Sequence, residues 1–339
     1  MAIIDKPSDY FETILYTGNG SSQNIGGLDF QPDWVWIKSR SLTKDHDLYD
    51  SVRGADKPLE SNTNVVEQDA GGQGLTSFRS DGFAIGNRST INSNSATQVS
   101  WNWLAGGTGS SNTDGSISST VSANTTSGFS IVSYTGNGSS GSTIGHGLNA
   151  VPEVVLIRRR NQSTDWNFQL GYSQYLKLNS TDQAIATSGG LVGSGSTSTI
   201  TVDANAYVNA SGDTYIAYCF AGKKGFSKFG SYTGNGSTDG TFVYTGFKPA
   251  FLIVRNADAT ADWVMNDNKR NTFNPNSNML FANTSGDENT GTARSDFLSN
   301  GFKIRSSNSD WNGNGNKMLY MAFAENPFVT STGIPTTAR

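Results

Sequence analysis

The sequence has little of what many enzymes and membrane proteins depend on. It contains one cysteine, Cys219, and two histidines, and only 15% of its 339 residues are charged. One cysteine cannot form an internal disulfide, so the fold is not expected to need an oxidising compartment. No apolar run reaches membrane-spanning length, and residues 1–10 lack the apolar core of a signal peptide. We therefore expect no membrane insertion and no classical secretion, and we expect folding in the cytoplasm.

Strong positive charge is also missing. The net charge is −4, and the longest basic run is Arg158-Arg159-Arg160. Nucleic-acid binding needs a dense positive surface, so it is not expected. Aromatic residues make up 11% of the chain, and there are 39 glycines among many Ser, Thr and Asn residues. Frequent turn formers together with enough aromatics for a core favour an all-β fold over a helical one.

One pentapeptide, Tyr-Thr-Gly-Asn-Gly, occurs three times, at residues 16–20, 134–138 and 232–236. The copies are 118 and 98 residues apart, which is the size of a domain and too long for a solenoid repeat. Thr-Gly-Asn-Gly supplies positions that tolerate positive φ, as a tight turn after a strand requires. The chain is therefore predicted to contain three tandem copies of one all-β unit.

A second landmark follows each pentapeptide. It is a proline, a short apolar run and then a basic residue, which is Lys38, Arg158 or Arg255. A short run that is apolar throughout predicts a central strand buried on both faces, and proline is admissible where such a strand starts. The basic residue is interpreted as the point where the strand leaves the core for solvent.

Two further elements complete the unit. Ser80-Asp81-Gly82-Phe83 and Ser299-Asn300-Gly301-Phe302 predict a hairpin in copies 1 and 3. In copy 2 the Gly/Ser/Thr-rich segment 189–199 replaces it, so that hairpin is expected to have diverged or to have grown a loop. Each copy closes with an aromatic strand, at residues 98–103, 215–220 and 320–323.

These landmarks predict three tandem jelly-roll-like (concanavalin-like) β-sandwich domains. The predicted domains are residues 1–107, 128–223 (diverged) and 224–328, with a Gly/Ser/Thr/Asn linker or loop at 108–127 and a C-terminal tail at 329–339. Because the join at 222–225 is short, copies 2 and 3 are expected to be rigidly coupled and copy 1 to be freer.

No catalytic or metal-binding constellation recurs. His46 and His146 are isolated in different copies, without the spacing of a metal site. There is no nucleophile elbow, Walker sequence or recurring acidic pair. Asp50-x-x-Arg53 and Asp267-x-x-Arg270 occupy equivalent places and are interpreted as exposed, turn-fixing ion pairs of little energetic weight, with a ligand contact as the less favoured alternative. We expect no catalytic residues, no metal, no cofactor and no enzymatic activity.

Carbohydrate binding is the alternative that the tryptophans support. Four of them lie in predicted strands, where an aromatic ring more often belongs to the core. Trp311 lies in the polar segment 309–314, and exposed aromatics mark interfaces. Trp311, with its neighbours Asp310 and Asn312, is therefore the candidate contact for a ligand or partner.

These motifs resemble a domain family of tailed phages, especially marine phages and cyanophages. Copy 1 carries the pattern at residues 30–40, 50–54 and 77–86, and copy 3 carries it at residues 296–303 and 321–328. Copy 2 resembles it least, since it lacks the Asp-x-x-Arg and Ser-Asp-Gly-Phe elements. The resemblance implies a lectin-like β-sandwich in a virion structural protein, such as a fibre, spike or capsid decoration, and it brings no catalytic residues.

The sequence thus predicts a non-catalytic phage virion structural protein that is assembled in the host cytoplasm and resides in the virion. Its expected partners are other virion proteins and copies of itself, for example in a trimer, with host-surface glycan as a further partner. Without heptads or collagen-like repeats, contacts between copies are expected through domain faces. The alternatives are a glycan-binding adhesin or receptor-binding protein and, less favoured, a polysaccharide depolymerase. Loops that differ between copies are where a specific contact is expected.

Overall fold

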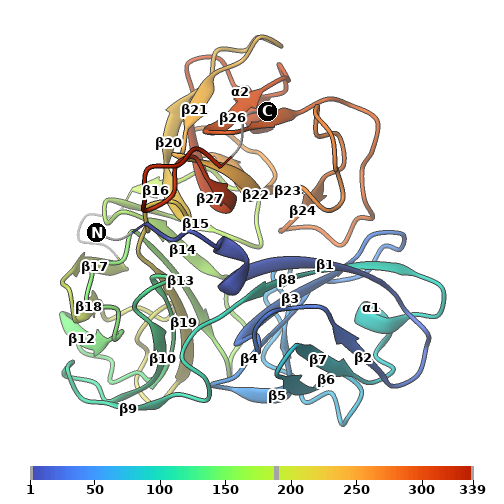
Figure 1. The fold of residues 1–339 in the computed structure, drawn as a ribbon. Helices are drawn as coiled ribbons and strands as arrows, with labels where there is room; N and C mark the ends of the chain where they lie inside the picture. The colour runs from blue at the N-terminus through green and yellow to red at the C-terminus, as the bar shows by residue number, and fades with distance from the viewer. Residues whose placement is uncertain (1–2, 187–190, 337–339) are drawn as a thin grey trace.

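The computed structural model describes residues 3–186 and 191–336. The protein is all-β, with several antiparallel sheets, and the helices in the described part are one 3₁₀ turn and two α-helices of four residues. None of these helices is long and apolar enough to cross a membrane. Figure 1 shows three lobes around a common centre, which we call units 1, 2 and 3 in chain order.

Unit 1 consists of eight strands and two short helices. They are η1 (Pro7–Asp9), β1 (Phe11–Thr17), β2 (Gln23–Gly26), β3 (Trp34–Ser39), β4 (Asp47–Asp50), β5 (Gly54–Leu59), β6 (Leu75–Arg79), β7 (Gly82–Ile85), α1 (Ser89–Asn92) and β8 (Thr97–Trp103).

The regular elements in the described part of unit 2 are all strands. They are β9 (Ser110–Asn112), β10 (Ser119–Asn124), β11 (Phe129–Thr135), β12 (Ser142–Gly145), β13 (Val154–Arg159), β14 (Asn167–Leu170), β15 (Gln174–Lys177), β16 (Ile185–Ala186), β17 (Val192–Gly195), β18 (Thr199–Val202) and β19 (Thr214–Phe220).

Unit 3 repeats the plan of unit 1. Its elements are β20 (Ser227–Thr233), β21 (Phe242–Tyr244), β22 (Phe247–Asn256), β23 (Val264–Asp267), β24 (Leu280–Phe281), β25 (Ser295–Leu298), β26 (Gly301–Ile304), α2 (Ser309–Asn312) and β27 (Lys317–Pro327).

All three units share one strand order. The larger sheet runs β1-β8-β3-β4-β5 in unit 1 and β20-β27-β22-β23-β24 in unit 3. Unit 2 has the same order, β11-β19-β13-β14-β15, within a sheet that β10 and β9 extend at one edge and β16 at the other. The smaller sheets run β2-β7-β6, β12-β18-β17 and β21-β26-β25. The repeat in the sequence is thus a repeat of topology, and the two sheets of each unit enclose a separate hydrophobic cluster.

The apolar run after each proline forms a central strand, as predicted. In β3, Val35 and Ile37 belong to the core of unit 1, whereas Trp34 and Trp36 belong to a core shared by all three units. Successive side chains of a strand point to opposite faces. The run is therefore apolar throughout because each face of the strand meets a different core.

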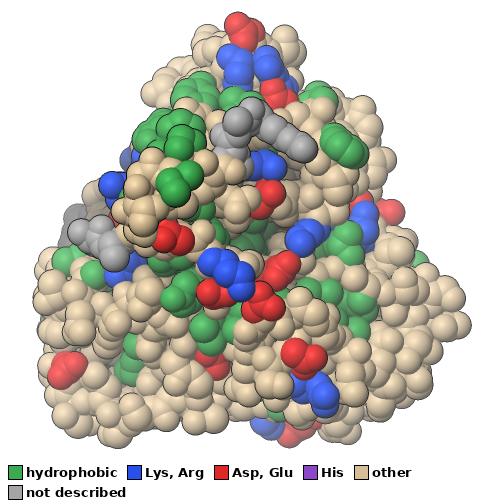
Figure 2. All heavy atoms as spheres, viewed as in Figure 1, with side chains coloured by type: hydrophobic (Ala, Val, Ile, Leu, Met, Phe, Trp, Pro, Cys, Tyr) green, Lys and Arg blue, Asp and Glu red, His purple; other side chains and the backbone are tan. Residues whose placement is uncertain are grey.

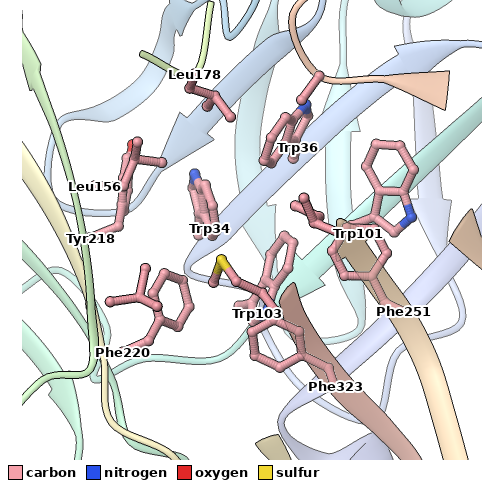
Figure 3. Close-up of a cluster of buried hydrophobic side chains, with 14 of the residues drawn as sticks. Trp34, Trp36, Trp101, Trp103, Leu156, Leu178, Tyr218, Phe220, Phe251 and Phe323 are labelled. Atoms are coloured by element: carbon pink, nitrogen blue, oxygen red, sulfur yellow. The ribbon is translucent and has the colours of Figure 1, made fainter. Parts of the chain in front are cut away.

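The shared core is a cluster of buried side chains from all three units, part of which Figure 3 shows at close range. The Trp34 ring lies 4.4 Å from Trp103 of its own unit and stacks on Tyr218 of unit 2 at 4.5 Å between centroids. Phe323 of unit 3 contacts Phe220 of unit 2, with centroids 5.9 Å apart. Only about 20 Å³ of cavity remains among these rings, so the core is packed as closely as a domain interior. Each aromatic buried there contributes about 2–3 kcal/mol relative to exposure in water.

Two expectations about the joins between units are wrong. The segment 108–127, expected to be a linker or loop, contains β9 and β10, and β10 pairs along its whole length with β11. Unit 1 is not freer than the others, because its tryptophans form part of the shared core. The Gly-, Ser-, Thr- and Asn-rich composition of this segment is typical of a linker. Such segments also form strands, however, when a neighbouring strand edge is available to them.

The hairpins of copies 1 and 3 are confirmed as β6–β7 and β25–β26. Copy 2 retains the same element as β17–β18, so its sequence has diverged more than its structure. The prediction for segment 189–199 falls partly on residues 187–190, which lie outside the described residues.

Candidate functional site

The three units are joined by equivalent contacts that run in a closed cycle. An aromatic residue lies directly before each of β4, β14 and β23. A ring nitrogen of this residue forms a hydrogen bond with a backbone carbonyl of the preceding unit. The pairs are His46 Nε2 with Phe281 O at 3.0 Å, Trp166 Nε1 with Glu60 O at 2.7 Å, and Trp263 Nε1 with Lys177 O at 3.0 Å. Unit 1 thus contacts unit 3, unit 2 contacts unit 1, and unit 3 contacts unit 2.

His46 holds a structural position in this cycle. Trp36 Nε1 donates to His46 Nδ1 at 2.8 Å, so Nε2 carries the hydrogen that is donated to Phe281 O. The ring is fully buried. Burial, followed by the positive charge of Lys38, holds the pKa of His46 well below its ordinary value. The imidazole is therefore neutral with both nitrogens engaged, which leaves it no proton to exchange with a substrate.

The basic residues at the ends of the central strands follow the same cycle. Lys38 Nζ donates to Ser285 O of unit 3 at 3.2 Å, and Nη2 atoms of Arg158 and Arg255 donate to backbone carbonyls of units 1 and 2. All three side chains are fully buried. The expectation that they mark an exit to solvent is therefore wrong, because the neighbouring unit covers the end of each strand.

Burial without a carboxylate partner lowers the pKa of all three basic side chains. It lowers the pKa of Lys38 to about 8 and that of Arg158 and Arg255 to about 10. The guanidinium groups of Arg158 and Arg255 lie 5.6 Å from the ring centroids of Trp166 and Trp263. Cation–π attraction in a desolvated setting offsets part of the cost of burying these charges.

The Asp-x-x-Arg pair of unit 1 lies at the contact with unit 2. Asp50 fixes its own turn, as predicted, since Oδ1 accepts from the backbone N–H groups of Val52 and Arg53. It is not exposed, however, because both charged side chains are fully buried, with Arg53 Nε 2.5 Å from Asp50 Oδ2. Tyr218 of unit 2 donates its hydroxyl to Asp50 Oδ2 at 2.7 Å. The motif therefore ties two units together and is not a surface ion pair.

Unit 3 uses the same motif against unit 1. Arg270 Nε lies 2.6 Å from Asp267 Oδ2, with both side chains fully buried, and Trp101 Nε1 of unit 1 donates to Asp267 at 3.0 Å. Glu288 extends this tie by accepting from Arg270 and from Arg40 of unit 1. Asp267 therefore lies where no bulky substrate can reach it.

Glu67 is the counterpart of Glu288 at the contact between units 1 and 2. It accepts from Arg53 of its own unit and from Arg160 of unit 2, the latter at 2.8 Å to each carboxylate oxygen. Burial alone would raise the pKa of Glu67, but the two guanidinium groups outweigh it and hold the pKa below its ordinary value.

The contact between units 2 and 3 lacks both the aspartate and the ring donor that join the other pairs of units. The strand register places Leu170 where units 1 and 3 have Asp50 and Asp267. Met321 of unit 3 stands where the other units have Tyr218 and Trp101, the ring donors. Leu170 packs against the shared core. Donor and acceptor are thus absent from the same contact, so neither is left buried without the other.

The residues proposed as a ligand contact are mostly internal. Trp311 is 1% exposed and belongs to the core of unit 3, and Asn312 is fully buried. Neither side chain is available at the surface, because α2 directs both inward. Asp310 is half-buried, and burial together with nearby Asp262 raises its pKa. The polar neighbours of Trp311 in sequence were therefore a misleading signal of exposure.

Asn312 instead locks the pentapeptide turn of unit 3. It accepts from Asn235 N at 2.8 Å, and its amide donates to Asn235 Oδ1, Ser237 O and Ser306 O. Asn92 and Asn209 lock the other two pentapeptide turns in the same way. The sequence signal was present, since an apolar residue followed by Asn stands at the same place in each copy.

The remaining pentapeptide residues are explained by the same turn. The tyrosine hydroxyl donates to the carbonyl of the residue before the locking asparagine, in unit 1 from Tyr16 to Ile91 O at 2.8 Å. A Cβ on Gly18 would collide with Ser93 O, and Gly20 has a φ of 69°. The pentapeptide is therefore a structural turn, as the sequence predicted.

Other candidate groups are internal as well. His146 is fully buried, with Nε2 3.2 Å from Ser196 O. Cys219 is buried as predicted, and burial raises the pKa of its thiol to about 12. Asp47 is fully buried and bonded to Arg88, Tyr49 and Thr90. Within the described ranges, no three His, Cys, Asp or Glu side chains are grouped as metal ligands.

One sizeable groove opens where units 2 and 3 join. It has a volume of about 710 Å³, within the range of small-molecule sites. We call it the junction groove; its walls include Glu153, Lys223, Lys224, Lys228, Tyr244 and the C-terminal segment 328–331. Three consecutive residues of β20, Ser227 to Phe229, line it. Because β20 is the last strand of its sheet, the groove runs along the outer edge of that sheet, where Ser227 bridges to Lys223.

The comparisons with known proteins bear on the chain as a whole. A search of curated proteins finds no match. One family model, described as "Domain of unknown function (DUF7483)", matches residues 6–327, from η1 of unit 1 to the end of β27 in unit 3. The chain belongs to the DUF7483 family. Since one match spans the three units, a DUF7483 domain comprises the whole three-lobed body and not a single sandwich.

Proposed function

We propose that this DUF7483 protein is a non-catalytic structural component of a phage virion, such as a fibre, spike or capsid decoration. Each unit is proposed to be a jelly-roll-like sandwich. The observation that carries the proposal is the shared core, which joins three sandwiches into one rigid body through buried tryptophans and ion pairs. The groups that could do chemistry, such as His46, Asp50 and Asp267, are used to make these joints.

The surface suits such a role. Figure 2 shows a face that is mostly polar but uncharged, with charged side chains in small scattered groups. A body that needs no disulfides can fold in a bacterial cytoplasm and remain stable after release. Both properties fit a particle component that is assembled inside a cell and exposed afterwards.

Self-association is proposed to use the outer faces of the units. The apolar inner faces of the three sandwiches are already buried against one another within one chain. Three separate subunits would have to form a trimer to bury such faces. Contacts between copies, and with other virion proteins, are therefore proposed to be polar and to involve outer strands and loops.

Mass spectrometry of purified phage particles tests the proposal. The protein is expected among the components of mature virions at a copy number set by particle symmetry. Its absence from mature particles, with abundance only in the lysate, would overturn the virion role.

A second candidate function is a glycan-binding adhesin, and the junction groove favours it. The groove combines an aromatic ring, Tyr244, that is 53% exposed with polar and basic side chains. Sugar-binding proteins use such a combination of a stacking surface and hydrogen-bonding groups. This function and the virion role are compatible if the groove mediates attachment to a host surface.

A further inference from the structure

Unit 3 differs from its two counterparts where β21 borders the junction groove. Strand register places Tyr244 at the position of Gly26 in unit 1 and Gly145 in unit 2. Phe242, on the same face of β21, stands at the position of Asn24 and Thr143 and is 43% exposed. Two exposed aromatics therefore occupy one edge strand of unit 3, and the other units have small or polar residues there.

The junction groove differs between units 2 and 3 in what lies beside the first strand of the larger sheet. In unit 2 the strand equivalent to β20 is β11, and its outer edge is covered by β10. In unit 3 no strand covers the same edge, where Ser227 alone bridges to Lys223, and the loop 222–225 and the C-terminal segment 328–331 form walls around it. A space that β10 fills in unit 2 is thus left accessible beside Tyr244 in unit 3.

The groove is positively charged in a chain of net charge −4. Lys223, Lys224 and Lys228 line it, and within the described part of the chain none of them forms an ion pair. Glu153 is the carboxylate in the wall, and its Oε1 accepts from the backbone N–H of Gly222. Burial lowers the pKa of Lys223, as expected for an ammonium group without a compensating anion. An anionic ligand would supply that missing charge.

Tyr244 is held in place as a platform. Lys228 Nζ donates to Tyr244 O at 2.7 Å and lies 5.4 Å from the centre of the Tyr244 ring. One lysine therefore fixes both the backbone and the orientation of the ring, while half of the side chain remains exposed. A ring with an adjacent positive charge suits a ligand that has both an apolar face and an acidic group.

We propose that the junction groove binds an acidic oligosaccharide, with one sugar ring stacked on Tyr244 and its carboxylate or sulfate groups facing Lys223 and Lys224. Pyranose rings have an apolar face of C–H groups, and a hexose chain fits a groove of this volume. The proposal names the ligand class for the host-surface contact of the proposed function. The binding itself needs only the isolated protein, so its failure leaves the virion role untouched, and absence from virions leaves the binding untouched.

Calorimetric titration of the full-length protein tests the proposal with three hexasaccharides of matched length: an oligogalacturonate, a sulfated heparin fragment and neutral maltohexaose. Binding of at least one acidic sugar is expected, weakening as salt is added, with no binding of maltohexaose. The two acidic probes distinguish carboxylate from sulfate recognition. Equal binding of maltohexaose, or no binding of either acidic sugar up to millimolar concentration, would overturn the proposal.

Substitutions locate the site. Tyr244→Ala is expected to weaken binding about tenfold, and Lys223→Ser with Lys224→Ser to weaken it about tenfold and reduce the salt dependence. Phe273→Ala, at an aromatic 83% exposed elsewhere in unit 3, and Lys317→Ser are matched controls expected to bind as wild type. Thermal unfolding of each variant verifies folding. Loss of binding in the lysine variant with full binding in Tyr244→Ala would assign the groove to a simple anion or an acidic peptide and overturn the saccharide assignment.

Discussion

At the scale of single residues, this protein places its ionisable groups in joints between units. The Asp50–Arg53 pair is fully buried and accepts a further hydrogen bond from the next unit. A buried ion pair contributes little net stability compared with an apolar replacement of both partners, but removal of one partner leaves an unpaired buried charge. The motif is therefore expected to be far more sensitive to single substitution than a surface pair.

Asp50→Asn is predicted to lower the free energy of unfolding by about 3 kcal/mol, because Arg53 stays buried and loses its closest counterion, keeping only the longer contact with Glu67. Asp239→Asn is the matched control, since Asp239 is 82% exposed and pairs with Lys303 at the surface; it should leave the unfolding midpoint unchanged. Urea unfolding followed by tryptophan fluorescence measures both. Equal, small effects of the two substitutions would show that the buried tie has no special weight.

His46 should make stability depend on pH. In the folded chain burial keeps it neutral, with a pKa well below 6.5, whereas the unfolded chain binds a proton near pH 6.5. Above pH 6.5 neither state is protonated and His46 adds no pH dependence. As the pH falls below 6.5, His46 binds a proton in the unfolded state but not in the folded state. The free energy of unfolding therefore decreases, by up to about 1.4 kcal/mol per pH unit.

His46→Gln retains a donor and an acceptor but does not titrate. The difference in unfolding free energy between wild type and this variant is predicted to be constant above pH 7 and to shift in favour of the variant between pH 6.5 and 5. Chemical denaturation at several pH values measures it. A difference that stays constant over the whole range would mean that His46 is protonated in the folded state.

At the scale of elements, the strands were predictable and their surroundings were not. Proline followed by an apolar run identified β3, β13 and β22, because such a run requires cores on both faces. An apolar run does not show that its second core is shared between units, so the sequence alone predicts that Lys38 faces solvent. The sequence also could not distinguish β10 from a linker, because its pairing depends on a strand edge created by the rest of unit 2.

The residues of the candidate site were also not predictable from local sequence, because their exposure depends on the surrounding fold. Trp311 was selected for its polar neighbours, but a short helix turns it inward, and exposure is decided by that turn and not by composition. The exposed aromatic of the junction groove is Tyr244, which lies in an alternating strand next to buried Val243. Comparing the three copies position by position would have found it, since the other copies have glycine there.

A buried asparagine stabilises each pentapeptide turn, and in unit 1 it is Asn92. Asn92→Ala removes hydrogen bonds to Asn19, Ser21 and Gly86. It is predicted to destabilise the protein by about 1–3 kcal/mol, because buried backbone groups lose their partners. Asn94→Ala, at an exposed position two residues away, is the matched control and should have no measurable effect. Thermal unfolding of both variants checks this; similar stabilities would show that the turn does not need its lock.

At the scale of the whole molecule, three sandwiches behave as one body if the shared core is as important as its packing indicates. A lone unit would expose a face of tryptophans or phenylalanines that the other two units cover. The contacts of unit 1 with its two neighbours contain ion pairs between units, Arg160 with Glu67 and Arg40 with Glu288. The contact between units 2 and 3 instead combines apolar packing and the covalent join at 222–225 with hydrogen bonds from Arg255 and Trp263 to backbone carbonyls of unit 2. The family match across residues 6–327 agrees with a body that is inherited as a whole.

Differential scanning calorimetry of the intact chain tests this claim most directly. If the shared core makes the three units one cooperative body, the protein unfolds in one transition whose calorimetric enthalpy equals the van't Hoff enthalpy. Separate transitions, or a calorimetric enthalpy about three times the van't Hoff value, would show three domains that unfold independently and would contradict the account.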